Sequence, residues 1–264
     1  GYEVIALDKA QSPGQGSSNA SSAVVRFNYS TFDSVALAWE SFHCWKNWPE
    51  HLGNKQESYS QMIDVGVVML DAPVISGEKT SQLFEAVGVP YEVWSSDVLA
   101  KNVNGIDVGK YWPPKTLADG AFWEDPKDSL GAIFTPNGGY IDDPLLATQN
   151  LAQAALNTGV TFRFKTTVTA ILREGDKTLG VEINNSEKIF ADIVINVGGP
   201  WSNQINALAG VGQDLWLPGC DRQHLFRREG RHQERRVDLD HLQRRRAFTD
   251  RCGSLICLPP FFGG

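Results

Sequence analysis

Apolar residues recur along the chain in two patterns, as short continuous runs and as repeats at helical spacing. The first run, Tyr2–Leu7, is followed by Asp8, and it predicts a buried parallel strand with an acidic residue at its carboxyl end. The last run, Ala191–Val197, stops at a Gly-Gly pair and predicts a second such strand, a glycine turn and a helix over 202–208.

Strands and helices alternate between these two runs. Asp143 and Pro144 are typical of a helix start, and Pro49 is expected to end an earlier helix. Gly159 is expected to terminate the later one. The predicted helices lie at 33–48, 79–87 and 144–156, and the predicted strands at 63–70, 91–94, 160–164, 167–172, 179–183 and 189–197. The alternation predicts an α/β protein.

A loop rich in Gly and Ser follows the first strand, over residues 11–22. Gly14 and Gly16 can adopt positive φ, and the small side chains leave backbone N–H groups exposed, which suits phosphate. Arg26 stands at the exit of this loop and is one of three arginines before residue 219.

The composition indicates a globular protein. A chain of 264 residues with 42% hydrophobic residues can bury a sizeable core, and its longest apolar runs are too short to cross a bilayer. The four cysteines have neither the spacing of a zinc site nor that of a disulfide framework. We therefore expect a cytoplasmic protein with no metal and no membrane contact.

The charge pattern changes abruptly near residue 219. Residues 1–218 contain 11 Lys and 3 Arg, whereas residues 219–264 contain no Lys and 10 Arg. A nucleic-acid arm, a solvated insertion and a change of reading frame would each produce such a tail. Because acidic residues such as Asp221 and Glu234 interrupt it, we favour the frame change and expect no nucleic-acid partner.

Three motifs occur in a characteristic order. They are a strand and Gly-Ser-Ser loop ending in Arg (residues 1–26), the segment 131–144, and an apolar strand running into Gly-Gly-Pro-Trp-Ser (residues 194–202). Together they resemble the FAD-dependent oxidoreductases of the D-amino-acid oxidase and sarcosine oxidase family. The second motif is similar to the family's hairpin and helix that return the chain to the FAD-binding lobe. Residues 19–29 are most similar to the sarcosine oxidase branch.

The resemblance implies FAD as the cofactor and assigns roles around the strands. Asp8 would hydrogen-bond the adenosine ribose, although an ordinary loop acid is the alternative. Val168 would contact adenine through its backbone, or serve only as a core strand residue. Gly198 and Gly199 would let the main chain approach the cofactor, unless they only form a tight turn.

The resemblance also assigns roles in the loop. Gly16, Ser17, Ser18 and Ser22 would line the pyrophosphate and ribityl chain, with a plain flexible loop as the alternative. Arg26 would lie near the isoalloxazine and stabilise the reduced ring as a fixed cation, which makes it the candidate catalytic residue. A surface salt bridge is the alternative for Arg26.

By resemblance, the protein oxidises the C–N bond of a small amine, or of an N-methyl or D-amino acid, to an imine. Hydride equivalents would pass to the flavin, and oxygen or an electron-transfer protein would then accept the electrons. Two alternatives use the same fold: a non-catalytic assembly or scaffold protein, and a hydroxy-acid or glycerol-phosphate dehydrogenase.

The expected architecture is a Rossmann-like FAD-binding domain, incomplete at its N-terminus, with an inserted mixed α+β substrate domain. The FAD-binding domain should comprise residues 1–58 and 130–215, the substrate domain residues 59–129, and the anomalous tail residues 219–264. The family's Gly-x-Gly-x-x-Gly turn precedes the strand equivalent to Tyr2–Leu7. That strand should therefore lack a neighbour and present an open edge, and we expect this fragment itself to be inactive.

Overall fold

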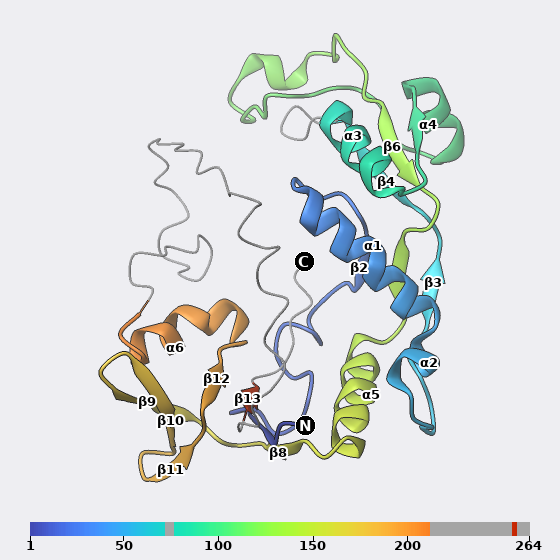
Figure 1. Cartoon of the computed structure of the whole chain (residues 1–264). Coiled ribbons are helices and arrows are strands. Elements are labelled where there is room, and N and C mark those ends of the chain that lie inside the picture. The colour runs from blue at the N-terminus through green and yellow to red at the C-terminus, as the bar shows by residue number, and fades with distance from the viewer. Residues whose placement is uncertain (72–76, 212–254, 258–264) are drawn as a thin grey trace. The chain divides into compact units, whose positions relative to one another are not determined.

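The computed structural model describes residues 1–71, 77–211 and 255–257 (Figure 1). The chain divides into two compact units, one formed by residues 1–16 with the part from Ala155 onward, the other by residues 17–154. Both units combine strands and helices, which confirms the predicted mixed α/β class. Most of the anomalous tail lies outside the described residues.

The first unit contains a four-stranded sheet with the strand order β12-β13-β1-β8, in which every neighbouring pair is parallel. Its strands are β1 (Val4–Leu7), β8 (Thr161–Arg163), β12 (Ile193–Ile195) and β13 (Leu255–Cys257). The expectation that Tyr2–Leu7 presents an open edge is wrong. A strand from the C-terminal part of the chain occupies the interior position between β1 and β12, so β1 is paired on both sides.

An antiparallel meander accounts for the next part of this unit. It consists of β9 (Val168–Glu174), β10 (Lys177–Ile183) and β11 (Glu187–Phe190). The predicted strand over 189–197 is two strands, because β11 ends at Phe190 and β12 begins at Ile193. Between them Ala191 is buried, and its N–H donates to the carbonyl of Leu179 at 2.9 Å. After β12 follow a 3-10 turn, η2 (Gly199–Trp201), and helix α6 (Ser202–Leu208).

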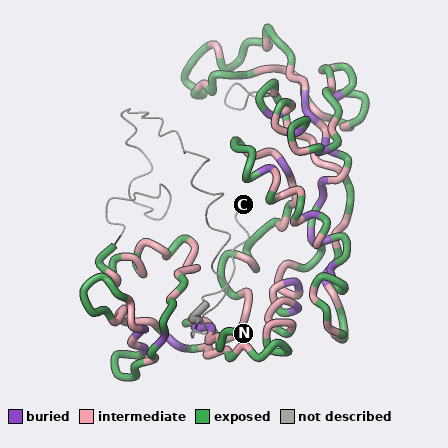
Figure 2. The backbone as a smooth tube through the Cα atoms, viewed as in Figure 1, coloured by how far each residue is buried: buried purple, intermediate pink, exposed green. Residues whose placement is uncertain are grey.

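The core of the first unit joins the meander to β1. Leu7, Val181, Ile183 and Ala191 form a buried cluster, with exposures between 0% and 7%. Figure 2 colours the backbone of each unit by burial, with buried residues in purple. Partly buried apolar residues surround them: Ile5, Val168, Ile171, Ile189, Val194, Val197 and Ile205. The apolar runs of β1 and β10 therefore form this core, as their patterns predict.

Most of the described helices lie in the second unit. They are α1 (Phe32–Lys46), α2 (Trp48–Leu52), α3 (Gly77–Val87), α4 (Ser96–Asn102) and α5 (Pro144–Asn157), with a 3-10 turn η1 (Gly120–Trp123). The prediction that Pro49 ends a helix is wrong, because α1 already stops at Lys46 and Pro49 lies in the first turn of α2, where its missing N–H costs nothing. No helix in the described part of the chain is long and apolar enough to span a bilayer.

Two three-stranded antiparallel sheets complete the second unit. The first has the order β2-β7-β3 and the second β4-β6-β5. Their strands are β2 (Val24–Val25), β3 (Met62–Asp64), β4 (Val67–Leu70), β5 (Glu92–Trp94), β6 (Ala132–Thr135) and β7 (Gly139–Ile141). The single strand predicted over 63–70 is broken at Gly66, which has φ +74°. A Cβ atom there would lie 2.3 Å from Cε2 of Phe134, so only glycine fits this corner.

Asn150 on α5 fixes that helix to the segment before β3. Its side chain is 3% exposed, accepts hydrogen bonds from Ser60 N–H at 3.0 Å and Trp48 Nε1 at 3.4 Å, and donates to Gln56 Oε1 at 2.7 Å. It also donates to the carbonyl of Ser58 at 2.8 Å. A buried amide with this many partners is expected to contribute strongly to stability.

We expect Asn150→Ala to lower the free energy of unfolding by about 2–3 kcal/mol, because buried donors and acceptors lose their partner. Urea unfolding measures this change. Gln149→Ala is the matched control, since Gln149 is exposed on the same helix and should change stability little. Equal effects of the two substitutions would contradict the proposed role of the network.

Asp142 caps the turn before α5. Burial raises the pKa of its carboxyl, but hydrogen bonds from Gln61 N–H, the Ser60 hydroxyl and Asp143 N–H outweigh burial, so the pKa lies below its usual value. The ionised form is therefore bound more favourably in the folded chain than in the unfolded chain.

The contribution of Asp142 should be complete above the unfolded pKa of 3.8 and should disappear as the pH falls through the lower folded pKa. Asp142→Asn is expected to cost about 1 kcal/mol at neutral pH, because charge-assisted hydrogen bonds are stronger than neutral ones. Unfolding free energies of both proteins between pH 7 and pH 2 test this. A difference that stays constant over the whole range would contradict the assignment.

Candidate functional site

The carboxyl ends of the parallel strands in the first unit meet at one edge of the sheet. Ala6 of β1 and Ile195 of β12 both lie in register with Cys257 of β13. Asp8 follows β1 directly, and the Gly198-Gly199 turn begins three residues after the end of β12, so the structure brings both to the same edge, two strands apart. Ligands of open α/β sheets bind outside this edge.

Asp8 is held rigidly where β1 ends. Its N–H donates to the carbonyl of Arg163 at 3.1 Å, and its carbonyl accepts from Thr166 N–H at 2.9 Å. Its Oδ1 accepts from Ala10 N–H at 2.8 Å. Among the described residues, no cation pairs with the Asp8 carboxylate. The carboxylate therefore has acceptor capacity for a hydroxyl-bearing ligand.

The glycine turn after β12 is shaped by its own neighbours. Asn196 Oδ1 accepts from Gly198 N–H at 3.0 Å, and Asn196 Nδ2 donates to the carbonyl of Ser202 at 2.9 Å. A Cβ atom on Gly198 would lie 2.7 Å from Cδ1 of Ile205, and Gly199 has φ +54°. Packing and backbone geometry thus already account for both glycines, and their contact with a cofactor stays a prediction.

Two residues that shape this edge were not predicted from the sequence. Asn196 shapes the glycine turn after β12 through the hydrogen bond that its Oδ1 accepts from Gly198 N–H. Its position between an apolar strand and a glycine is the sequence signal that could have predicted this Asx turn. The other is Lys9, whose ammonium lies 4.9 Å from the ring centroid of Trp201. This cation–π contact ties the loop after β1 to the turn after β12, and no sequence spacing predicts it.

Val168 begins β9 and pairs with Ile183 of β10. Its side chain packs against the core cluster of the first unit, as the simpler alternative for this residue predicts. Its proposed backbone contact with adenine stays a prediction.

The Gly- and Ser-rich loop is open to solvent. Gly16, Ser17 and Ser22 are exposed and Ser18 is half-buried. A Cβ atom on Gly16 would meet nothing within 4 Å, so the packing of the chain does not explain this glycine. The boundary between the two units falls after Gly16, and Ser17, Ser18 and Ser22 belong to the second unit.

Arg26 lies just beyond β2 in the second unit. Its Nη1 donates to the carbonyl of Asn28 at 2.9 Å, and its guanidinium carbon lies 5.2 Å from the ring centroid of Tyr29. No carboxylate among the described residues forms an ion pair with it. A guanidinium held in this way retains N–H donors and a full positive charge for a ligand.

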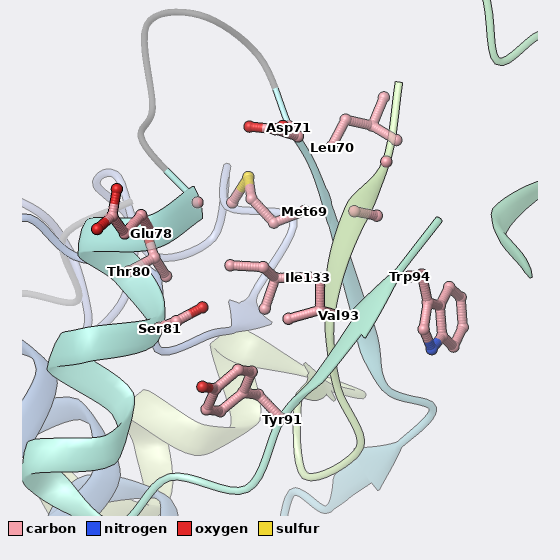
Figure 3. A pocket seen from close by; sticks show the side chains of 13 residues that line it. Met69, Leu70, Asp71, Glu78, Thr80, Ser81, Tyr91, Val93, Trp94 and Ile133 are labelled. Carbon is pink, nitrogen blue, oxygen red and sulfur yellow. The ribbon is translucent and has the colours of Figure 1, made fainter. Parts of the chain in front are cut away.

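A separate cavity of about 450 Å³ lies between α3 and the sheet β4-β6-β5 (Figure 3). Met69, Val93 and Ile133 stand in one row across the three strands and form its floor, and Asp71 and Glu78 lie at its rim. Figure 3 shows Trp94 pointing away from this cavity, and its ring stacks on Phe134 at 4.5 Å. None of the residues predicted for the cofactor site lines the cavity.

Two features of the first unit fit the binding of FAD. An anchored carboxylate stands at the carboxyl edge of a parallel sheet, and the open loop that follows it contains Gly16, which packing does not explain. A carboxylate suits a ribose, and exposed backbone N–H groups suit a phosphate. In the second unit, taken by itself, the Arg26 guanidinium has no carboxylate partner among the described residues, and such a cation suits an electron-rich ring.

Comparisons with known proteins identify the family and the fold. A model of the family described as FAD dependent oxidoreductase matches residues 1–256. A glycerol-3-phosphate dehydrogenase of Mycobacterium leprae (strain TN) is 37% identical over 67 residues, which make up 24% of this chain and 12% of that relative.

Two solved structures are similar in fold. L-proline dehydrogenase from P. horikoshii superposes with a TM-score of 0.61 at 20% identity, covering 80% of this chain and 56% of that one. Glycine oxidase from Geobacillus kaustophilus gives a TM-score of 0.56 at 18% identity, covering 79% of this chain and 52% of that one. This chain therefore spans little more than half of these two structures and a smaller part of the mycobacterial relative.

If Asp8 holds the adenosine ribose, Asp8→Ala should weaken FAD binding about tenfold, because a charge-assisted hydrogen bond is lost. Quenching of flavin fluorescence during titration with protein measures the dissociation constant. Asp192→Ala is the matched control, since Asp192 is exposed just before β12, at the opposite edge of the same sheet. The assignment fails if both variants bind FAD as the unchanged chain does.

Proposed function

The chain belongs to the FAD-dependent oxidoreductase family, and from this premise we propose that it serves to oxidise the C–N bond of a small amine or amino acid. The proposal rests on one observation about Arg26. Its guanidinium is held by a hydrogen bond to the carbonyl of Asn28 and has no carboxylate partner among the described residues. Such a cation supports both a ring that becomes electron-rich and an anionic substrate.

The choice of an amine follows from the sequence motifs. Residues 19–29, which include Arg26, resemble the sarcosine oxidase branch, whose members act on N-methyl amino acids. The similar solved structures include a proline dehydrogenase and a glycine oxidase, but at 20% and 18% identity they support only the shared fold.

Each group has a defined task in this proposal. FAD, when bound, accepts the hydride equivalent from the carbon next to the substrate nitrogen. Asp8 and the loop with Gly16, Ser17, Ser18 and Ser22 hold the cofactor, and Arg26 supplies positive charge beside the reacting groups. Oxygen or an electron-transfer protein then accepts the electrons. The domain division proposed from the sequence, with residues 59–129 on the substrate side, stays a prediction.

A second candidate function is dehydrogenation of glycerol 3-phosphate. The mycobacterial dehydrogenase with 37% identity over 67 residues favours it. Arg26 is compatible with this candidate as well, because a guanidinium binds phosphate and carboxylate equally readily. The two candidates differ in the bond that is oxidised, so substrate reduction of the flavin separates them.

Anaerobic reduction of the flavin distinguishes the candidate functions. N-methyl and D-amino acids should bleach the flavin absorption, whereas glycerol 3-phosphate should not. The comparison uses a protein of the relatives' length, because this chain spans little more than half of the two similar structures. Bleaching by glycerol 3-phosphate alone would favour the second candidate, and bleaching by neither would favour a non-catalytic scaffold.

Arg26 can be tested without turnover through the midpoint potential of the bound flavin. Arg26→Ala should lower the two-electron potential by about 30 mV, which corresponds to about 1.4 kcal/mol of lost stabilisation of the reduced ring. Arg26→Lys should restore most of the potential, because the charge remains. Lys101→Ala removes an exposed cation on α4 and is the control. An unchanged potential in Arg26→Ala would exclude a role for this cation beside the ring.

A further inference from the structure

The cavity between α3 and the sheet β4-β6-β5 has two chemically different ends (Figure 3). Met69, Val93 and Ile133 form its apolar floor, and the ring of Tyr91 lies at one end of that floor. The carboxylate of Asp71 lies at the opposite end, close to the start of α3. The cavity thus offers an apolar surface that ends at a negative charge.

Backbone pairing fixes the position of Asp71. Its N–H donates to the carbonyl of Gly131 at 2.9 Å, which extends the pairing of β4 with β6 by one residue. A Cβ atom on Gly77 would lie 3.5 Å from Asp71 Oδ1 and 3.8 Å from Cδ1 of Ile133. The carboxylate and the apolar floor therefore meet beside the first residue of α3.

The described residues that line the cavity carry negative charge only. They include Asp71 and Glu78 but no Lys, Arg or His. Neither carboxylate forms an ion pair with a described residue. Lys79 follows Glu78 on α3 but does not line the cavity. Because exposed carboxylates retain acceptor sites, this end of the cavity favours a cation and disfavours an anion.

The apolar floor is open to water at β5. Val93 is 71% exposed although its side chain faces α3, whereas Ile133 beside it on β6 is 5% exposed. A ligand that covers such exposed apolar surface gains free energy. The volume of about 450 Å³ lies within the range of about 300–1,000 Å³ that is common for small-molecule sites. The cavity therefore suits a small molecule with an apolar body.

We propose that this cavity binds a small protonated amine with an apolar body, of the arylalkylamine class. The ammonium group pairs with Asp71 and Glu78, and the hydrocarbon part covers Val93, Ile133 and the ring of Tyr91. The described residues contain no group of three or more His, Cys, Asp or Glu that could hold a metal ion. An organic cation therefore fits this cavity better than a metal ion.

The proposed site is separate from the groups assigned to FAD. Neither Arg26 nor any residue assigned to cofactor binding lines the cavity. The inference therefore concerns a second ligand, and it holds whichever substrate the chain oxidises.

Two probes of matched shape test the proposal. 2-Phenylethylamine is protonated at neutral pH, and 2-phenylethanol is its neutral analogue. Calorimetric titration of the 264-residue chain without FAD, at low salt, measures both affinities. The amine should bind about fivefold more tightly than the alcohol, which is the effect of a solvent-exposed ion pair.

Three variants locate the binding. Asp71→Asn combined with Glu78→Gln should remove the preference for the amine and leave the affinity for the alcohol unchanged. Val93→Ser should weaken both probes about threefold, because apolar contact is lost. Asp97→Asn removes an exposed carboxylate on α4 and is the matched control, which should keep both affinities. All the substituted side chains are exposed, so we expect these variants to fold.

Hydrogen–deuterium exchange gives a reading that does not depend on any variant. The amine should slow exchange in residues 67–71 and 91–94. Absence of binding, equal affinity for the two probes, a preference that survives the double substitution, or protection only elsewhere in the chain would overturn the proposal. None of these measurements involves the flavin, so the proposed amine oxidation can fail while this inference stands, and the reverse.

Discussion

The pairing of β1 on both sides is the constraint on which the site depends. Backbone hydrogen bonds to β8 and β13 fix the direction and the end of β1, and therefore the position of Asp8. Because all four strands are parallel, the turn after β12 emerges at the same edge. The contact of Lys9 with Trp201 joins the two loops there. Loss of β13 would leave two apolar strands with unpaired backbone groups, which a sheet interior does not tolerate.

A different constraint governs the segment after β2. Phe27 is anchored in the core, which fixes the backbone of the residues on either side of it. Arg26 is positioned by the carbonyl of Asn28 and the ring of Tyr29 and by no carboxylate among the described residues. Charge and hydrogen-bonding capacity are thus held in place before any ligand binds. Preorganisation of this kind lowers the entropic cost of binding.

The sequence predicted those parts of the fold that a local pattern determines. The continuous apolar runs of β1 and β10 and the Asp143-Pro144 start of α5 have clear periodicity or capping signals, and the structure confirms them. The break at Gly66 is different, because its cause is the ring of Phe134, distant in sequence. The pairing of β13 with β1 is another non-local contact, and no composition signal in an Arg-rich tail reveals it.

The candidate site was predictable to a similar extent. Asp8, Gly198 and Gly199 stand at strand ends that the apolar runs mark, so their common edge follows from parallel pairing. Lys9 has no such signal in the sequence, because its contact with the ring of Trp201 joins two loops that are distant along the chain.

The central claim is that this chain binds FAD at the carboxyl edge of the parallel sheet, through Asp8 and the loop that follows it. Hydrogen–deuterium exchange of the 264-residue chain with and without FAD tests it most directly, since bound cofactor protects the backbone amides it covers. The account predicts slower exchange at residues 8–16 and 196–202, and unchanged exchange around the cavity lined by Met69 and Ile133. Protection confined to that cavity, or no protection in the two segments, would contradict it.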